Sequence, residues 1–91
     1  MNTLALLLIA ATGAVFDETF AQANAAYEAG RFDEAVELYE RLTEASVENP
    51  VVYYNLANAH YRNGDAARAI ANYEYALTLW PLLLKYVEDG R

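Results

Sequence analysis

The sequence predicts an all-α fold, an α-α superhelix in which two helical hairpins stack and apolar helices flank them. Two observations lead to this prediction. First, residues 20–42 align with residues 54–76 at a shift of 34, with tyrosines such as Tyr27 and Tyr61 in register. Second, helix-start residues and glycines alternate along residues 17–81, and glycine accepts the positive φ that commonly ends a helix.

Start and stop signals delimit the first hairpin. Asp17 is expected to begin its first helix and Gly30 to end it, because aspartate caps helix N-termini and glycine tolerates the left-handed conformation. Asp33 is expected to begin the second helix, whose apolar residues recur on one face, as in a helix that packs on neighbours. With the second hairpin included, the four helices are expected near residues 17–29, 33–45, 50–63 and 66–79.

The second hairpin carries stronger signals. Asn49 is an N-cap residue and Pro50 occupies the first helical position, where proline is favoured. Gly64 supplies the turn, and Asp65 can cap the next helix. That helix is expected to stop before Pro81, since the residue before a proline is biased away from helical geometry.

The 34-residue period resembles the tetratricopeptide repeat family, whose repeats are helical hairpins of this length. The first hairpin matches the family pattern in its second half, at Gly30, Ala35 and Tyr39. The second hairpin matches it throughout, at Tyr53, Leu56, Ala57, His60, Ala69, Tyr73 and Pro81. The resemblance implies a two-repeat domain over residues 17–81 that acts as a non-enzymatic scaffold for protein–protein interaction.

Both ends of the chain lie outside the repeat pattern. Residues 1–16 are uncharged, and their apolar run Leu4–Phe16 is shorter than the ~18–20 residues of a membrane-spanning helix. Three interpretations of this segment stay open: an uncleaved signal-like anchor, a signal peptide left in place, or a helix that packs on the first hairpin. Residues 82–91 are expected to form a C-terminal cap or tail.

Composition excludes several classes of site. Cysteine is absent and histidine occurs once, at His60, so neither thiol chemistry nor a histidine-rich metal site is expected. The net charge of −7 disfavours nucleic acid as a partner. No metal, cofactor or catalytic residue is expected. The resemblance places His60 where the family carries a packing tyrosine, which implies a half-buried ring with one nitrogen hydrogen-bonded.

The resemblance also implies a binding surface, because stacked repeats of this family present their first helices to a concave groove. Asparagine amides can donate to and accept from a peptide main chain, and tyrosines bury area at low entropic cost. Because residues 17–50 carry a net charge of −7, a peptide or protein partner of neutral or basic character is expected. In the alternative, the asparagines bond within each repeat and the tyrosines only pack. By register, the groove residues are Phe20, Asn24, Tyr27, Tyr54, Asn55, Asn58, Tyr61 and Arg62.

A second function class stays open. The chain could be a small structural subunit held by its hydrophobic N-terminal helix in a membrane-associated or self-assembling complex. Uncovered apolar ends would favour association into a homo-oligomer. The uncharged start and the second hairpin also resemble bacterial envelope proteins of the aerotolerance operon type, which implies a periplasmic or membrane-anchored location rather than a cytoplasmic one.

Overall fold

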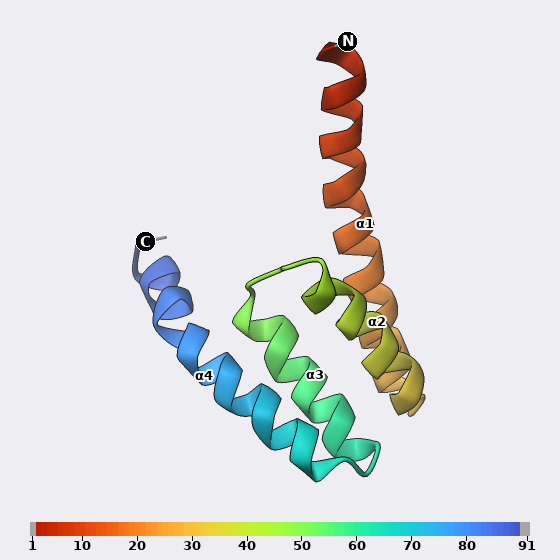
Figure 1. Ribbon diagram of the computed structural model, residues 1–91, viewed down its shortest axis with the longest axis vertical. Helices are drawn as coiled ribbons and strands as arrows, with labels where there is room; N and C mark the ends of the chain where they lie inside the picture. Colours follow the sequence, from red (N-terminus) through yellow and green to blue (C-terminus); the bar gives the residue numbers. More distant parts are fainter. Residues whose placement is uncertain (1, 90–91) are drawn as a thin grey trace.

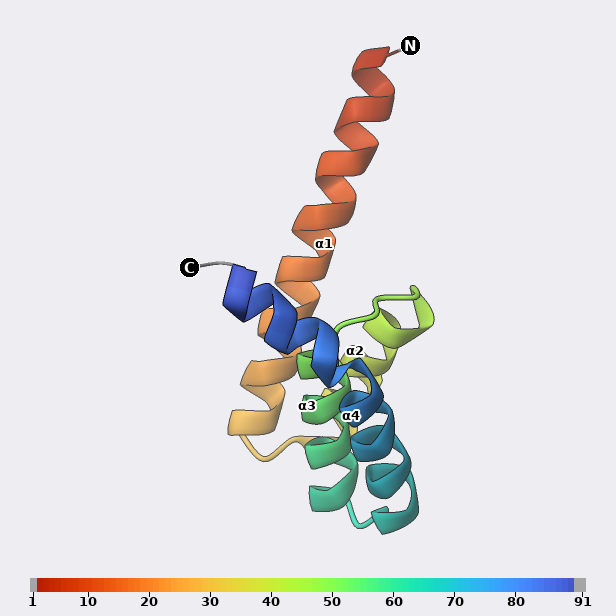
Figure 2. The ribbon, with the colours of Figure 1, turned by 90° about the vertical axis from the view of Figure 1, so that its left-hand side faces the viewer.

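The chain folds into helices joined by short turns, as seen in a computed structural model that describes the backbone of residues 2–89 and the side chains of residues 15–81. No strand occurs within residues 2–89, so the predicted all-α fold is confirmed. Consecutive helices run antiparallel and pack side by side (Figures 1 and 2). The helices are α1 (Asn2–Glu28), α2 (Phe32–Glu44), α3 (Pro50–Arg62) and α4 (Ala66–Asp89).

The two hairpin turns repeat the same geometry 34 residues apart. Gly30 has φ of 79° and Gly64 has φ of 85°, in the left-handed region that side chains disfavour. The N–H of Arg31 donates to the Ala26 carbonyl at 2.9 Å, and the N–H of Asp65 donates to the His60 carbonyl at 2.8 Å. Both bonds satisfy carbonyls that would otherwise lack donors at a helix end, and the predicted role of both glycines is confirmed.

Two of the four predicted helix starts in the hairpins, those of the second hairpin, are formed as expected. The side chain of Asn49 accepts a hydrogen bond from the Val51 N–H at 2.8 Å, with Pro50 as the first residue of α3. Asp65 Oδ1 accepts a bond from the Arg68 N–H at 3.0 Å and so caps α4. Each cap satisfies one of the unpaired donors at a helix N-terminus.

The start of α2 differs from the prediction by one residue. Arg31 is its N-cap and makes no side-chain cap bond, so Asp33 lies inside the first turn. The reason is the tight Gly30 turn, which leads directly into the helix. Arg31 Nε instead pairs with Glu34 Oε2 at 2.6 Å across the first turn.

The predicted outer bounds of α1 and α4 are wrong. α1 begins at Asn2 and runs through Asp17 without a break, because the preceding residues are mostly alanine and leucine, which favour helix. α4 continues past Pro81 to Asp89. Proline removes one backbone hydrogen bond, here to the Leu77 carbonyl. Both residues are exposed, so that side of the helix is open to water.

Small residues dominate the contacts between the helices. Ala57 and Ala69, two of the residues that match the family pattern, are buried. Because alanine has no side chain beyond Cβ, the helices can lie close enough for large neighbours to fill the remaining space. The central core consists of Ala23, Ala26, Ala35, Leu38, Tyr39, Leu56 and Ala59.

The N-terminal part of α1 extends beyond the other helices (Figures 1 and 2). Over residues 2–89, no helix combines the length and apolar character needed to cross a bilayer. The side chains of residues 2–14 and 82–91 lie outside the described part, so the three interpretations of residues 1–16 and the proposed cap at residues 82–91 stay predictions.

Candidate functional site

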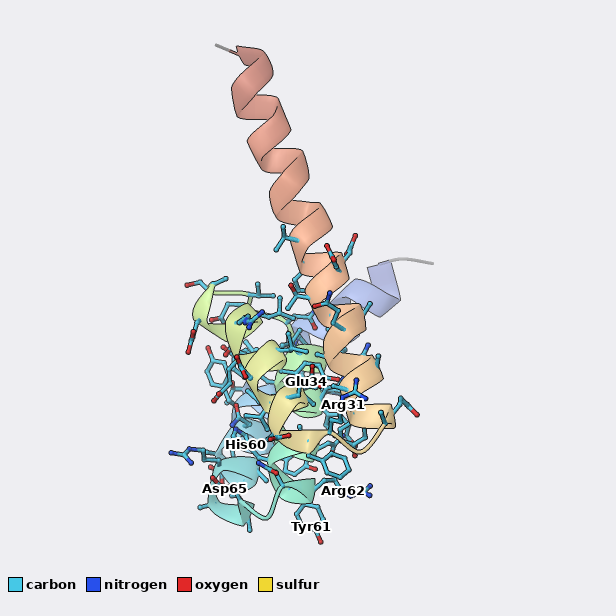
Figure 3. All side chains as sticks on the ribbon, turned by 90° about the vertical axis from the view of Figure 1, so that its right-hand side faces the viewer. Arg31, Glu34, His60, Tyr61, Arg62 and Asp65 are labelled. Carbon is cyan, nitrogen blue, oxygen red and sulfur yellow. The ribbon has the colours of Figure 1, made fainter. Side chains whose placement is uncertain are left out.

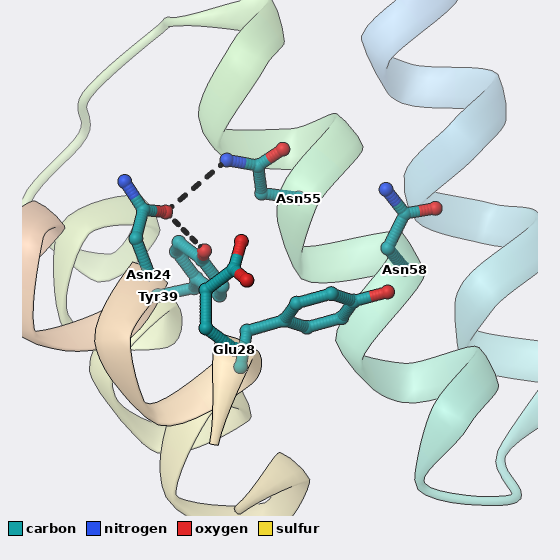
Figure 4. Close-up of a pocket in the computed structure, with 6 residues that line it drawn as sticks. Asn24, Glu28, Tyr39, Asn55 and Asn58 are labelled. Carbon is teal, nitrogen blue, oxygen red and sulfur yellow. Dashed lines mark hydrogen bonds between the residues drawn. The ribbon is translucent and has the colours of Figure 1, made fainter. Parts of the chain in front are cut away.

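A pocket of about 290 Å³ lies where the two hairpins meet. α1 contributes residues on one side, α3 contributes the facing side, and Tyr39 of α2 lies between them (Figure 4). The pocket therefore exists only when both hairpins are folded and stacked. Its lining residues are Asn24, Tyr27, Glu28, Tyr39, Asn55 and Asn58.

One asparagine oxygen joins three helices at this pocket. Asn24 Oδ1 accepts hydrogen bonds from the Tyr39 hydroxyl and from Asn55 Nδ2, the second at 3.4 Å (Figure 4). Asn24 lies on α1, Tyr39 on α2 and Asn55 on α3, so the network fixes the orientation of both amides. The Asn24 amino group and the Asn55 carbonyl oxygen take no part in it.

The second hairpin repeats half of this network. Asn58 Oδ1 accepts a hydrogen bond from the Tyr73 hydroxyl, and these residues stand 34 positions after Asn24 and Tyr39. Asn24 and Asn58 thus each bond a tyrosine of their own repeat, as the alternative expected for the asparagines, while Asn24 also bonds Asn55 of the next repeat. These bonds use the side-chain oxygen of each asparagine and leave its amino group for other partners.

Burial keeps the two tyrosine hydroxyls as donors. Desolvation raises the pKa of Tyr39 and, in the same way, the pKa of Tyr73, because burial disfavours the charged phenolate. A tyrosine hydroxyl with its ordinary pKa of 10 is already protonated at neutral pH, and the raised pKa extends that range, so both hydroxyls can donate to the asparagine oxygens.

The rim of the pocket is acidic and aromatic. Glu28 is exposed beside Asn24, and Tyr27 packs edge-to-face on Phe32 with ring centroids 5.3 Å apart. A tyrosine ring beside a carboxylate suits a cationic or amide-bearing group, which both can contact.

The structure divides the eight predicted groove residues among several places. Asn24, Tyr27, Asn55 and Asn58 line the pocket. Phe20 instead packs against the core, edge-to-face on Tyr39 at 6.2 Å. The remaining three, which lie elsewhere, are Tyr54, Tyr61 and Arg62.

These three residues do not reach the pocket. Tyr54 lines a second, apolar pocket with Tyr73 of α4. Tyr61 is 64% exposed at the turn end of α3 (Figure 3). The Arg62 guanidinium lies 4.7 Å from the centroid of the Phe32 ring, a cation–π contact within the protein.

Sequence reasoning missed Tyr39 as a pocket residue. Tyr39 and Tyr73 both match the family's packing position, which accounts for their rings but predicts nothing about their hydroxyls. The sequence signal for these hydroxyls is an asparagine followed 15 residues later by a tyrosine. It occurs in both repeats, at Asn24 and Tyr39 and at Asn58 and Tyr73.

His60 is a buried residue of α3, only 5% exposed (Figure 3). This is deeper than the half-buried position expected. Its Nε2 has no hydrogen-bond partner among the described residues, and the nearest carboxylate oxygen, Glu40 Oε2, is 3.8 Å away. Within the described residues no group of three metal-ligating side chains occurs.

Comparison with known proteins agrees with this architecture. A search of curated proteins finds no match, and the finer resemblance to the aerotolerance operon type receives no support. A sequence model of the tetratricopeptide repeat matches residues 20–82, more than half of the chain. These residues include the C-terminal part of α1, all of α2 and α3, most of α4 and the pocket between the hairpins, and the chain accordingly belongs to the tetratricopeptide repeat family.

Proposed function

We propose that this chain is a non-enzymatic interaction module that binds a segment of a partner protein in the pocket between its hairpins. Tetratricopeptide repeats generally mediate protein–protein interaction. The observation that supports the proposed site is the network at Asn24, which orients two amides and leaves the Asn24 amino group and the Asn55 carbonyl oxygen without a partner among the described residues. A peptide main chain offers the matching carbonyl and N–H groups.

Charge favours a neutral or basic segment. Residues 17–50 contain nine acidic and two basic residues, a net charge of −7. Glu28 brings one of these carboxylates to the pocket. A lysine or arginine of the partner could pair with Glu28 and lie against Tyr27, which adds a charged contact at the exposed rim.

The binding test begins with a displayed library of short linear peptides, enriched on the full chain. The best binder is synthesised and titrated against wild type, Asn55→Ala and Asn72→Ala. Loss of one hydrogen bond to the Asn55 amide should weaken binding about fivefold to tenfold. Asn72 lies on α4 outside the pocket, so its variant, the matched control, should bind like wild type.

A second substitution tests the character of the partner. Glu28→Gln keeps the size of the side chain and removes its charge, so binders enriched in lysine or arginine should lose affinity and lose part of their salt dependence. Equal affinity for wild type, Asn55→Ala and Glu28→Gln would place the binding surface elsewhere and contradict the proposed site.

A structural subunit is the second candidate function. It rests on α1, which extends past the hairpins and whose first residues are apolar in sequence. Such a helix could hold the repeats on a membrane-associated or self-assembling complex, which would fit an envelope location. Removal of residues 1–16 would then abolish assembly but leave peptide binding intact.

A further inference from the structure

The pocket between the hairpins carries a carboxylate that no cation neutralises among the described side chains. Glu28 lines this pocket from the last turn of α1. Figure 4 shows its carboxyl group pointing toward the hydrogen-bonded pair Asn24 and Asn55. The ion pairs formed within residues 15–81 do not include Glu28. A carboxylate in this position attracts a positively charged group that brings hydrogen-bond donors.

The pKa of Tyr39 supports this position of the Glu28 carboxylate. Burial is the largest cause of the raised pKa of Tyr39, and the negative charge of Glu28 raises it further. The reason is that a nearby anion disfavours the charged phenolate. The electrostatic potential of Glu28 thus reaches the Tyr39 hydroxyl, which lies between α1 and α3 (Figure 4).

The arginines of the described side chains do not fill this place. None of the four arginines within residues 15–81 lines the pocket, and each of them contacts another group. Their contacts are Arg31 with Glu34, Arg41 with Glu37, Arg68 with Asp65, and Arg62 with the Phe32 ring. Within this part of the chain, the charge of Glu28 is therefore left for a partner to neutralise.

The arrangement of acceptors favours a guanidinium over an ammonium group. The Glu28 carboxylate comes from α1 and the Asn55 carbonyl oxygen from α3, so acceptors are present on both sides of the pocket. A guanidinium has five N–H donors in one plane and is more weakly hydrated than an ammonium. It can therefore donate to both helices at once and loses less hydration when it enters the pocket.

The aromatic pair beside Glu28 already contacts one guanidinium. Tyr27 packs edge-to-face on Phe32 with ring centroids 5.3 Å apart, and the Arg62 guanidinium lies 4.7 Å from the Phe32 centroid. Tyr27 itself lines the pocket and is half-buried. A planar guanidinium stacks on an aromatic ring, which a compact ammonium group does not do. An incoming arginine can therefore lie along Tyr27 while its N–H groups reach Glu28.

We propose that the pocket recognises an arginine side chain of the partner in preference to lysine. The guanidinium pairs with Glu28, donates to the Asn55 carbonyl oxygen and lies along Tyr27. This inference rests on the proposed peptide pocket and adds the side chain that the pocket selects. The amino groups of Asn24 and Asn58 then stay available for main-chain carbonyl groups beside that arginine.

The test uses three acetylated tripeptide amides of sequence Ala-X-Ala, in which X is arginine, lysine or citrulline. Citrulline matches arginine in shape but is uncharged and has an oxygen in place of one terminal nitrogen. Each peptide is titrated into the isotope-labelled full chain and followed through the side-chain amide resonances of Asn55. The arginine peptide should bind about threefold more tightly than the lysine peptide and about tenfold more tightly than the citrulline peptide.

Matched variants separate recognition at Glu28 from general attraction to an acidic protein. Glu28→Gln should weaken binding of the arginine peptide about fivefold and leave the citrulline peptide unaffected. Glu18→Gln removes one carboxylate from an exposed position of the same helix that does not line the pocket. This control variant should bind the arginine peptide like wild type, and circular dichroism should show that both variants are folded.

Four outcomes would overturn the proposal. The arginine peptide could leave the Asn55 resonances unchanged, the citrulline or the lysine peptide could bind as tightly as the arginine peptide, or Glu28→Gln could bind it like wild type. Finally, library-selected peptides could depend on Asn55 but contain no arginine, which would retain the pocket and reject only its preference. Library peptides that are insensitive to Asn55→Ala would instead contradict the pocket itself.

Discussion

At the scale of single residues, one hydrogen bond between a tyrosine and an asparagine recurs in both repeats. Asn24 pairs with Tyr39, and Asn58 pairs with Tyr73. Asn55 joins only the first pair. A side chain that carries a potential binding amide is thus also part of the scaffold, and its role in stability has to be measured apart from its role in binding.

Tyr39→Phe should cost about 1 kcal/mol of unfolding free energy, because it removes one buried hydrogen bond and little volume. Tyr73→Phe removes the equivalent bond at a less buried position and should cost less. Urea unfolding of both variants checks this order. A Tyr39→Phe variant as stable as wild type would show that the bond to Asn24 does not stabilise the fold.

His60→Tyr should keep or raise stability. The substitution removes a buried nitrogen without a partner, and an unsatisfied buried polar atom costs about 1–3 kcal/mol. The new hydroxyl could also reach toward Glu40. Thermal unfolding of this variant beside His60→Ala checks the prediction, since the alanine form leaves a cavity and should lose stability. A destabilised His60→Tyr form would mean that the imidazole fits its site better than the family's usual tyrosine.

At the scale of helices and turns, Gly30 and Gly64 offer a paired test. No atom lies within 4 Å of a Cβ built on either glycine, so alanine there meets only the strain of a positive φ. Gly30→Ala and Gly64→Ala should each cost about 1–2 kcal/mol. Asparagine, which tolerates this conformation better, should cost less at both positions. Equal stability of the alanine variants and wild type would contradict the role of these turns.

The cap of α4 gives a pH dependence. Hydrogen bonds from the Arg68 backbone N–H and side chain hold the pKa of Asp65 below its ordinary value of 3.8. A folded-state pKa below the unfolded one adds stability above the unfolded value, and that stability is lost as pH falls through the folded value. Asp65→Asn keeps a cap but removes the charge.

Asp65→Asn should therefore be less stable than wild type at neutral pH, and the difference should shrink below the ordinary pKa of the carboxyl. Urea unfolding across this pH range measures it. A stability difference that stays the same in acid would show that the Asp65 charge is not the cause.

At this scale, the sequence predicts those features that depend only on neighbouring residues of the chain. Gly30, Gly64, Asn49 and Asp65 act within one turn of the backbone, so their roles could be read from the sequence. The continuation of α4 past Pro81 could not, because the cost of proline depends on whether the unpaired carbonyl reaches water. The start of α1 was misplaced because an N-cap residue such as Asp17 signals a helix start only where the preceding chain is not already helical.

At the scale of the whole molecule, the candidate site belongs to the junction between two hairpins. There, residues of the first hairpin that face the second hairpin contact residues of the second hairpin that face the first. Asn24 and Asn55 form a hydrogen bond across this junction. Tyr54 instead lies on the side of the second hairpin that faces away from the first, beside Tyr73 and Leu77 of α4. The 34-residue register identified all three residues as groove candidates. It could not predict which of them lie at the junction, because that depends on how the hairpins stack.

The same stacking explains the asymmetry between the two ends of the array. The exposed face of α1 carries Glu18 and Gln22, while that of α4 carries Leu77 and Trp80. Arrays of repeats are stable and soluble when their outer faces are polar. The α1 face meets this condition at Glu18 and Gln22, whereas the α4 face leaves Leu77 and Trp80 exposed to water.

The binding of a peptide between the hairpins is tested most directly by the side-chain amide resonances of the asparagines. The library-selected peptide is titrated into isotope-labelled chain. Asn24, Asn55 and Asn58 should shift together and saturate, while Asn72 on α4 stays fixed and reports that the fold is unchanged. A peptide that binds at saturation without moving the first three amides would contradict the proposed pocket.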